Sequence, residues 1–135
     1  MYSTKLSVSI HILSIIALMG TEPVTSEYIA SSINTNPALV RRLMSRLKQA
    51  KLIETSTKLG VTGLAREKED ITLLDIFLAV EDHPLLFAIH GNTNHQCPVG
   101  AKIEVTLKQL YDNIQSETEK KLSAITLAEI TKEFI

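Results

Sequence analysis

The feature that most constrains the fold of this chain is the break Asn34-Thr35-Asn36-Pro37, which separates two short segments with apolar residues at helical spacing. Asn34 can end the first segment, because asparagine adopts the left-handed conformation with little penalty. Asn36 can cap the second, and proline suits its first position, where a missing N–H costs nothing. With Thr25 as a further N-cap, the sequence predicts a helix at Ser26–Ile33, a short turn and a helix at Pro37–Lys51. This is the spacing of a helix-turn-helix.

The helix predicted at Pro37–Lys51 has two contrasting faces. At about 100° per residue, one side carries the apolar residues Leu39, Leu43, Leu47 and Ala50. The opposite side carries small, cationic and amide side chains without an acid, at Ala38, Arg41, Arg42, Ser45 and Gln49. A slim face with hydrogen-bond donors suits the major groove of DNA, and the flanking Arg46 and Lys48 are expected to touch phosphates. The alternative is an amphipathic surface helix whose basic face is accidental.

The charge of the chain is unevenly distributed. The net charge is −1, yet residues 1–52 hold six bases and two acids, whereas residues 53–100 hold three bases and seven acids. Five of those six bases lie within Arg41–Lys51. Because local charge decides attraction to phosphates, this segment favours nucleic acid as a partner in spite of the overall balance.

The segments around the helix-turn-helix complete a small domain. A first helix is predicted at Lys5–Met19, and a β-branched strand at Leu52–Thr57 follows the third helix. The residues Lys58–Gly63 are expected to form a turn, with a return strand at Leu64-Ala65. A hairpin in this order is a wing, and an ordinary hairpin is the alternative. The predicted DNA contacts are Thr25, Ser26, Asn36, Ala38, Arg41, Arg42, Ser45, Arg46, Gln49, Lys58 and Thr62.

The C-terminal half is predicted to form three further helices. Thr72 and Asp75 resemble a capping box that opens a helix, which His83-Pro84 ends. A polar loop leads to a long helix at about Val99–Lys121, and Thr126 to Glu129 is a second capping box. Heptad-like spacing at Ile103, Leu107, Leu110 and Ile114 suggests either a partner helix in a homodimer or packing on the chain's own domain. The expected division is a DNA-binding domain at 1–83, a loop at 84–100, and a dimerisation helix with a helix packing back at 101–135.

Several functional classes are disfavoured by the sequence. The apolar stretch near Leu13–Met19 is too short to cross a membrane and lacks the flanks of a signal peptide. A single cysteine, Cys97, fits a reducing cytoplasm, so we expect a cytoplasmic protein without a membrane partner. No phosphate loop, zinc-protease motif or catalytic triad is present, which argues against an enzyme. His90, His95 and Cys97 do not follow a recognised metal-ligand spacing, and no metal site is expected.

The chain resembles the Rrf-type (Rrf-two) family of bacterial winged-helix regulators over nearly its whole length. The matching segments are Thr25-Ser26-Glu27-Tyr28-Ile29-Ala30, Asn36-Pro37-Ala38-Leu39-Val40-Arg41-Arg42-Leu43, Leu47-Lys48-Gln49-Ala50-Lys51-Leu52-Ile53, Ile71 to Ile76 with Ala79-Val80-Glu81, Cys97-Pro98-Val99-Gly100, and Ile125 to Ile130. The pairing of Asn34 to Pro37 with Cys97 to Gly100 is similar to the YwnA-like branch. The resemblance implies a mainly α fold with a small β-hairpin wing, and a homodimer that binds double-stranded DNA as a transcriptional regulator, a repressor by expectation.

Two departures from the family pattern matter. The family wing reads Gly-x-x-Gly-Gly-Tyr-x-Leu-Ala, whereas Gly63 is here followed directly by Leu64-Ala65, without the aromatic residue. Cluster-binding relatives carry three cysteines before the long helix, and this chain has only Cys97. We therefore expect no iron–sulfur cluster and no other cofactor. Cys97 is the candidate sensor, and a small molecule or a protein is the candidate effector. The alternative function is a winged helix that binds a partner protein, or a thiol- or metal-responsive sensor of that kind.

Overall fold

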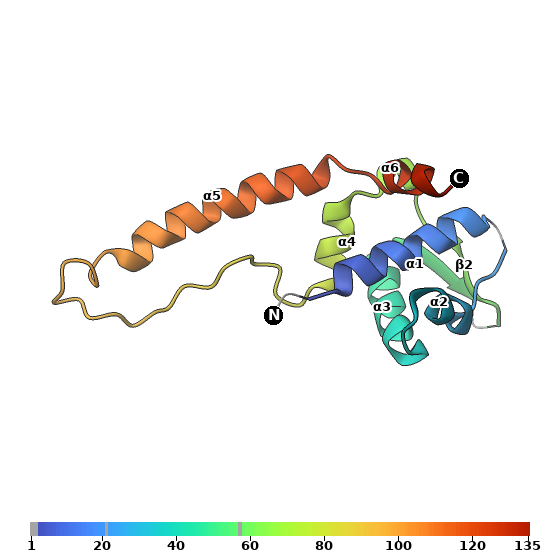
Figure 1. The fold of residues 1–135 in the computed structure, drawn as a ribbon, viewed down its shortest axis with the longest axis horizontal. Helices are drawn as coiled ribbons and strands as arrows, with labels where there is room; N and C mark the ends of the chain where they lie inside the picture. The colour runs from blue at the N-terminus through green and yellow to red at the C-terminus, as the bar shows by residue number, and fades with distance from the viewer. Residues whose placement is uncertain (1–2, 21, 57) are drawn as a thin grey trace.

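The computed structural model describes residues 3–20, 22–56 and 58–135, and Figure 1 shows a helical domain from which a long helix projects. The helices are α1 (Lys5–Met19), α2 (Ser26–Ile33), α3 (Pro37–Gln49), α4 (Leu73–Val80), α5 (Ile103–Ser123) and α6 (Leu127–Thr131), with short 3-10 turns at Lys68–Asp70 and Lys132–Phe134. The strands β1 (Ile53–Ser56) and β2 (Gly60–Leu64) form one antiparallel hairpin. The predicted order of helices around a single hairpin is confirmed.

Helix α1 lies at the centre of the domain and supplies much of its core. Its buried residues Ile12, Leu13 and Ile16 contact a cluster of apolar side chains from every neighbouring element. That cluster includes Ile29, Val40, Leu43, Leu47, Leu52, Val61, Ile71, Ile76, Val80 and Leu127. Val40 is fully buried and Leu39 only partly, so the apolar stripe of α3 is rotated slightly from the one predicted. The opposite face of α3 is consequently left to solvent.

Helix α3 ends two residues earlier than predicted, at Gln49. Lys51 adopts the left-handed conformation, with φ of 62°. Its N–H donates to the carbonyl of Lys48 at 2.9 Å, and the N–H of Leu52 donates to the carbonyl of Leu47 at 3.0 Å. These two bonds form a Schellman motif, which satisfies helix carbonyls that would otherwise lack partners. The motif places Lys51 outside the helix and turns the chain into β1.

The hairpin is longer than predicted on its return side. Strand β2 begins at Gly60, where the sequence predicted a turn as far as Gly63 and a strand only at Leu64. Gly60 has a φ of +80°, which favours glycine, and a side chain there would come within 3.2 Å of the carbonyl of Val24. Val61 pairs with Thr55 and is fully buried, so core packing draws this segment into the sheet. The predicted end of the first strand at Thr57 lies outside the described residues.

The C-terminal elements are as predicted in kind and shifted at their ends. Thr72 and Asp75 form both bonds of the predicted capping box, but α4 ends at Val80 instead of reaching His83. Helix α5 spans Ile103–Ser123, because residues 99–102 form a turn before it. At α6 the hydroxyl of Thr126 accepts a bond from the N–H of Glu129, which is one half of the second predicted box. Helix α6 packs against α1 with Leu127 fully buried.

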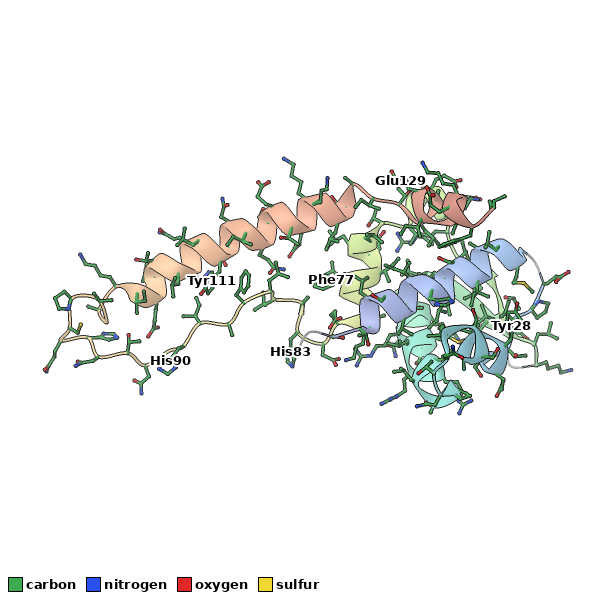
Figure 2. All side chains as sticks on the ribbon, in the orientation of Figure 1. Tyr28, Phe77, His83, His90, Tyr111 and Glu129 are labelled. Carbon is green, nitrogen blue, oxygen red and sulfur yellow. The ribbon has the colours of Figure 1, made fainter. Side chains whose placement is uncertain are left out.

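Helix α5 and the extended segment before it form an arm that projects from the domain (Figure 1). None of the described residues of α5 is buried. The segment turns back along α5, and its backbone at Pro84 and Leu86 is bonded to the side chain of Gln115 at 2.8 and 2.9 Å. The rings of Phe87 and Tyr111 meet at 5.3 Å, with Tyr111 directed from α5 toward the segment (Figure 2). Among the described helices, none is both long and apolar enough to cross a membrane.

Candidate nucleic-acid interface

The turn between α2 and α3 is held by the caps that the sequence predicts. Thr25 Oγ1 accepts from the N–H of Tyr28 at 3.1 Å, and Asn36 Oδ1 accepts from the N–H of Leu39 at 2.8 Å. Asn34 has a φ of 62°, and Pro37 occupies the first turn of α3. These local bonds satisfy helix N–H groups and set the angle at which α3 leaves the turn. Because Thr25 and Asn36 are exposed, both caps lie at the surface.

The exposed face of α3 contains the side chains predicted to read DNA. Ala38, Arg41, Arg42, Ser45 and Gln49 are all exposed, and Lys48 is exposed beside them. The buried side of the same helix is anchored by Val40, Leu43 and Leu47. A rigid helix with a slim, acid-free outer face can enter the major groove and present donors to base edges.

One acidic side chain approaches this face from α2. Glu27 Oε1 lies 3.6 Å from Arg41 Nη1, and the two side chains are 69% and 57% exposed. Ser26, another predicted contact, donates its hydroxyl to Glu27 at 3.3 Å. Sequence spacing did not reveal this pair, because it depends on how α2 crosses α3. Arg41 is therefore partly neutralised in the free protein.

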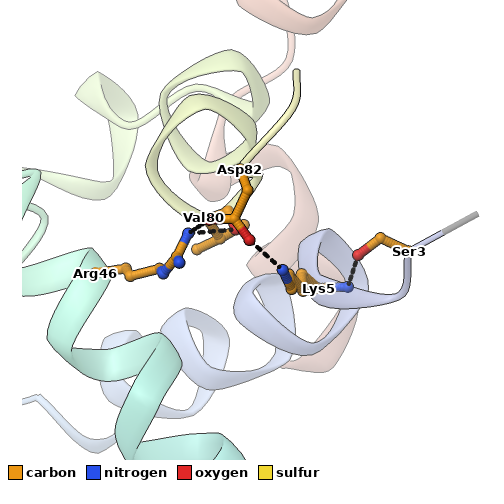
Figure 3. A network of polar contacts seen from close by, with 5 residues as sticks. All are labelled: Ser3, Lys5, Arg46, Val80 and Asp82. Atoms are coloured by element: carbon orange, nitrogen blue, oxygen red, sulfur yellow. Dashed lines mark hydrogen bonds and ion pairs between the residues drawn. The ribbon is translucent and has the colours of Figure 1, made fainter. Parts of the chain in front are cut away.

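Arg46, a predicted phosphate contact, is bonded within its own chain, although its side chain is 39% exposed. Its guanidinium forms an ion pair with Asp82 and donates to the carbonyl of Val80 at 3.2 Å (Figure 3). Asp82 also pairs with Lys5 at 2.9 Å. Packing of α3 against α4 brings Arg46 to this acid, which lies 36 residues later in the chain, and the contact of Arg46 with phosphates stays a prediction. No local pattern could have indicated that partner.

The two predicted DNA contacts in the wing differ in exposure. Lys58 is exposed near the tip, whereas Thr62 is half-buried and donates its hydroxyl to the carbonyl of Glu54 at 3.3 Å. A groove of about 800 Å³ separates the end of α3 from the hairpin and is lined by Lys48, Lys51 and Arg66, together with Ile53, Glu54, Thr55, Thr62 and Ala65. Neither Lys51 nor Arg66 was among the predicted DNA contacts, although Lys51 is the last residue of the basic run Arg41–Lys51.

The stripe predicted for dimerisation is only partly covered by its own chain. Ile103 and Leu107 are half-buried, whereas Leu110 and Ile114 are 55% and 43% exposed. The side of α5 that carries Tyr111 and Gln115 packs on the preceding segment. An apolar strip along a projecting helix is therefore open to a second helix.

Comparison with known proteins decides the family. A family model, Rrf2, described as an iron-dependent transcriptional regulator, matches residues 2–133. The chain belongs to the Rrf2 family. It is 40% identical to YwnA of Bacillus subtilis, described as an HTH-type transcriptional regulator, over 132 residues and 96% of each chain. The resemblance identified in the sequence is confirmed.

Solved structures share the fold of this chain. A crystal structure described as that of a DNA-binding protein has 34% identity and a TM-score of 0.77, covering 93% of this chain and 97% of the other. CymR, the global cysteine regulator of Bacillus subtilis, shares the fold with a TM-score of 0.73 at 21% identity, over 98% and 96% of the two chains. The winged-helix fold is confirmed, and the chain is a DNA-binding transcriptional regulator of the Rrf2 family and not an enzyme.

The Rrf2 model is described as that of an iron-dependent regulator, so the residues of this chain can be compared with those that an iron–sulfur cluster needs. Iron–sulfur clusters of this kind need several converging thiolates, and Cys97 is the single cysteine in the sequence. In the part of the chain that the structure describes, no three His, Cys, Asp or Glu side chains are grouped to hold a metal ion. The residues present do not fit an iron–sulfur cluster held by several thiolates.

Cys97 lies exposed in the turn before α5, and its backbone carbonyl accepts from the N–H of Ala101 at 2.9 Å. Backbone N–H groups, first that of Gly100 and then that of Val99, lower the pKa of the Cys97 thiol. Stabilising the thiolate increases the fraction that can react at neutral pH. His90 and His95 are exposed in the same loop. The role of Cys97 as a sensor stays a prediction.

Proposed function

We propose that this Rrf2 protein binds DNA as a homodimer, with α3 of each protomer in the major groove. The observation that carries the proposal is the exposed face of α3, which is fixed by caps at one end and a buried apolar side and which carries no acid. Arg41, Arg42 and Gln49 offer donors to base edges, while Ala38 and Ser45 keep the face narrow. Thr25, Ser26 and Asn36 lie at the helix starts, where backbone N–H groups approach phosphates.

The dimer follows from the exposed strip on α5. Leu110 and Ile114 leave apolar surface in water, and pairing with a second copy would remove it. Two protomers related by a two-fold axis present two copies of α3, which suits a palindromic site with half-sites one helical turn or a multiple apart. Light scattering at tens of micromolar protein tests this, and a persistent monomer would exclude it.

We further propose that the dimer acts in the cytoplasm as a repressor without a metal cofactor. A protein bound at an operator can block transcription without any further domain. Every described helix and strand belongs either to the DNA-binding domain or to the arm. The donor set around Cys97 supports the absence of a cluster. A reporter gene downstream of the operator distinguishes repression from activation in cells with and without this protein.

The decisive experiment for the reading helix is a double variant, Arg41→Ala with Arg42→Ala. An operator is first obtained by selecting from random duplexes with the wild-type protein. Loss of one bidentate contact costs about 1–3 kcal/mol, so operator affinity should fall at least about fivefold for the folded double variant. Unchanged binding would exclude α3 as the recognition helix. A winged helix that binds a partner protein would instead show weak DNA affinity with a shallow dependence on salt.

A further inference from the structure

Asp82 joins three parts of the fold through one carboxylate (Figure 3). It lies two residues beyond the end of α4, where the extended segment of the arm begins. One oxygen accepts from Lys5 Nζ at 2.9 Å, near the start of α1, and the other pairs with the guanidinium of Arg46 on α3. We refer to Lys5, Asp82 and Arg46 as the Asp82 bridge.

Arg46 is held in the Asp82 bridge from two directions. Besides pairing with Asp82, its Nη1 donates to the carbonyl of Val80, the last residue of α4. The last carbonyls of a helix have no partner within the helix, and a cation there is also favoured by the helix dipole. The side chain of Arg46 therefore closes α4, and its position on α3 is tied to the end of α4.

The Asp82 bridge stands next to the contacts that hold the arm. Two residues beyond Asp82, the carbonyl of Pro84 accepts from Gln115 Nε2 at 2.8 Å, and the N–H of Leu86 donates to Gln115 Oε1 at 2.9 Å. Gln115 is on α5, so the backbone groups that bond to α5 lie two and four residues along the chain from Asp82, which pairs with α3. Asp82 also lines a groove of about 530 Å³ between the start of α1, Phe77 and Leu85-Leu86.

We propose that Asp82 is a positioning residue that sets the orientation of the recognition helix relative to the dimerisation arm. The inference rests on the proposed function, in which α5 pairs two protomers and α3 reads DNA. Specific binding requires both α3 helices to meet successive grooves in register, whereas non-specific binding depends mainly on charge. Loss of Asp82 should therefore weaken discrimination between operator and other DNA more than it weakens general attraction.

The loss of the Asp82 charge should by itself strengthen the general attraction of the protein to DNA. Lys5 and Arg46 hold the pKa of Asp82 at about 2, so the carboxylate is charged at neutral pH. Removing that charge leaves two cations beside α3 with no acid between them, which raises attraction to any phosphate backbone. If the role of Asp82 is purely electrostatic, its loss should tighten binding to every DNA sequence by the same factor. If Asp82 is a positioning residue, its loss should lower the ratio of operator affinity to random-DNA affinity.

The test compares Asp82→Asn with Asp112→Asn, a matched control. Asp112 forms an exposed pair with Lys108 on α5 at 2.6 Å, so its substitution removes the same charge far from α3. Affinities for the selected operator and for a random duplex of equal length are measured by fluorescence anisotropy. We expect Asp82→Asn to lower the operator-to-random ratio by about fivefold or more, the usual scale of coupling between sites. Random-duplex affinity should be unchanged or higher, and Asp112→Asn should keep the wild-type ratio.

Three results separate the possible failures. An unchanged ratio for folded Asp82→Asn, or an equal loss in Asp112→Asn, would overturn the inference. Asp82→Glu keeps the charge and moves the carboxylate, so it should lower the ratio with random-duplex affinity unchanged, and it decides the matter if Asp82→Asn does not fold. The double variant Arg41→Ala with Arg42→Ala is measured alongside. If that double variant binds the operator normally, the proposed function fails, whereas a normal Asp82→Asn beside a defective double variant refutes only the role of Asp82.

Discussion

Glu27 provides a direct test of the electrostatics of the reading face. It lies on α2 with its carboxylate 3.6 Å from the guanidinium of Arg41, and both side chains are largely exposed. In the free protein this pair competes with DNA phosphates and bases for Arg41. In a complex the carboxylate would also face the phosphate backbone with like charge. Glu27→Gln should therefore tighten DNA binding instead of weakening it.

The expected magnitude follows from the exposure of the pair. Exposed ion pairs of this kind contribute about 0.2–1 kcal/mol, because water screens them and both side chains lose freedom. Releasing Arg41 for DNA costs that amount, and Glu27→Gln removes the cost. Affinity should rise by about 1.4- to fivefold for operator and random DNA alike. The gain should shrink as salt rises from about 50 to 200 mM, because salt screens exposed charges.

The assay is anisotropy of a labelled operator titrated with each variant over that salt range. Glu117→Gln is the matched control, because Glu117 is an exposed acid on α5, away from the reading face. Weaker binding by Glu27→Gln would show that the carboxylate itself contacts DNA, for example by accepting from a cytosine amine. An equal gain in both variants would show that net charge alone is responsible. Either result would refute the reasoning.

Four further predictions follow from the described contacts. Asn36→Ala should lower the free energy of unfolding by about 1 kcal/mol in urea titrations, because the N–H of Leu39 loses its cap; an unchanged midpoint would contradict it. Leu110→Asp should yield monomers in light scattering, since it places a charge within the exposed strip of α5; a dimer of the variant would argue against that interface. The pKa of Asp82 in the folded protein, about 2, lies below its ordinary value of 3.8, so its contribution to stability is present above about pH 4 and is lost as pH falls toward 2. In urea titrations at several pH values, Asp82→Asn should therefore lose less stability between about pH 4 and 2 than the wild type, and an equal loss would contradict this. Protein purified anaerobically from its native host should bind DNA without iron, and stoichiometric iron with visible sulfide-to-iron bands would disprove the absence of a cluster.

The elements that could be predicted from the sequence are those whose determinants are local. Asn34, Asn36 and Pro37 act within one turn of the chain, and Thr72 with Asp75 forms a capping box across three residues. Each depends on a side chain bonding to backbone a few positions away, so spacing alone is informative. The exposed face of α3 was predictable for the same reason, because helical periodicity places Arg41 and Arg42 opposite Leu43 and Leu47.

Two features that the sequence did not predict depend on contacts between distant segments, namely the start of β2 and the partner of Arg46. The start of β2 at Gly60 depends on Val61, which packs into the core and bonds to Val24 across the chain. The later start of α5 has a local cause, since the N–H groups of Lys102 and Ile103 bond to the carbonyl of Val99 in a turn before the helix. Charge type indicated that Arg46 could bind a phosphate, and only the packing of α3 on α4 brings Asp82 and Val80 to it.

The sequence by itself determined the helix-turn-helix, the cationic face of α3 and the presence of a single cysteine, because these depend on local bonding, periodicity and composition. The tertiary structure decided which cations remain free. It turns Arg46 and Lys5 toward Asp82 and brings Glu27 to Arg41, while it leaves Arg42 and Lys48 exposed. The physical reason is that a charged side chain pairs with whatever packing places within a few ångströms, and helix crossing sets that distance over separations that sequence spacing does not encode.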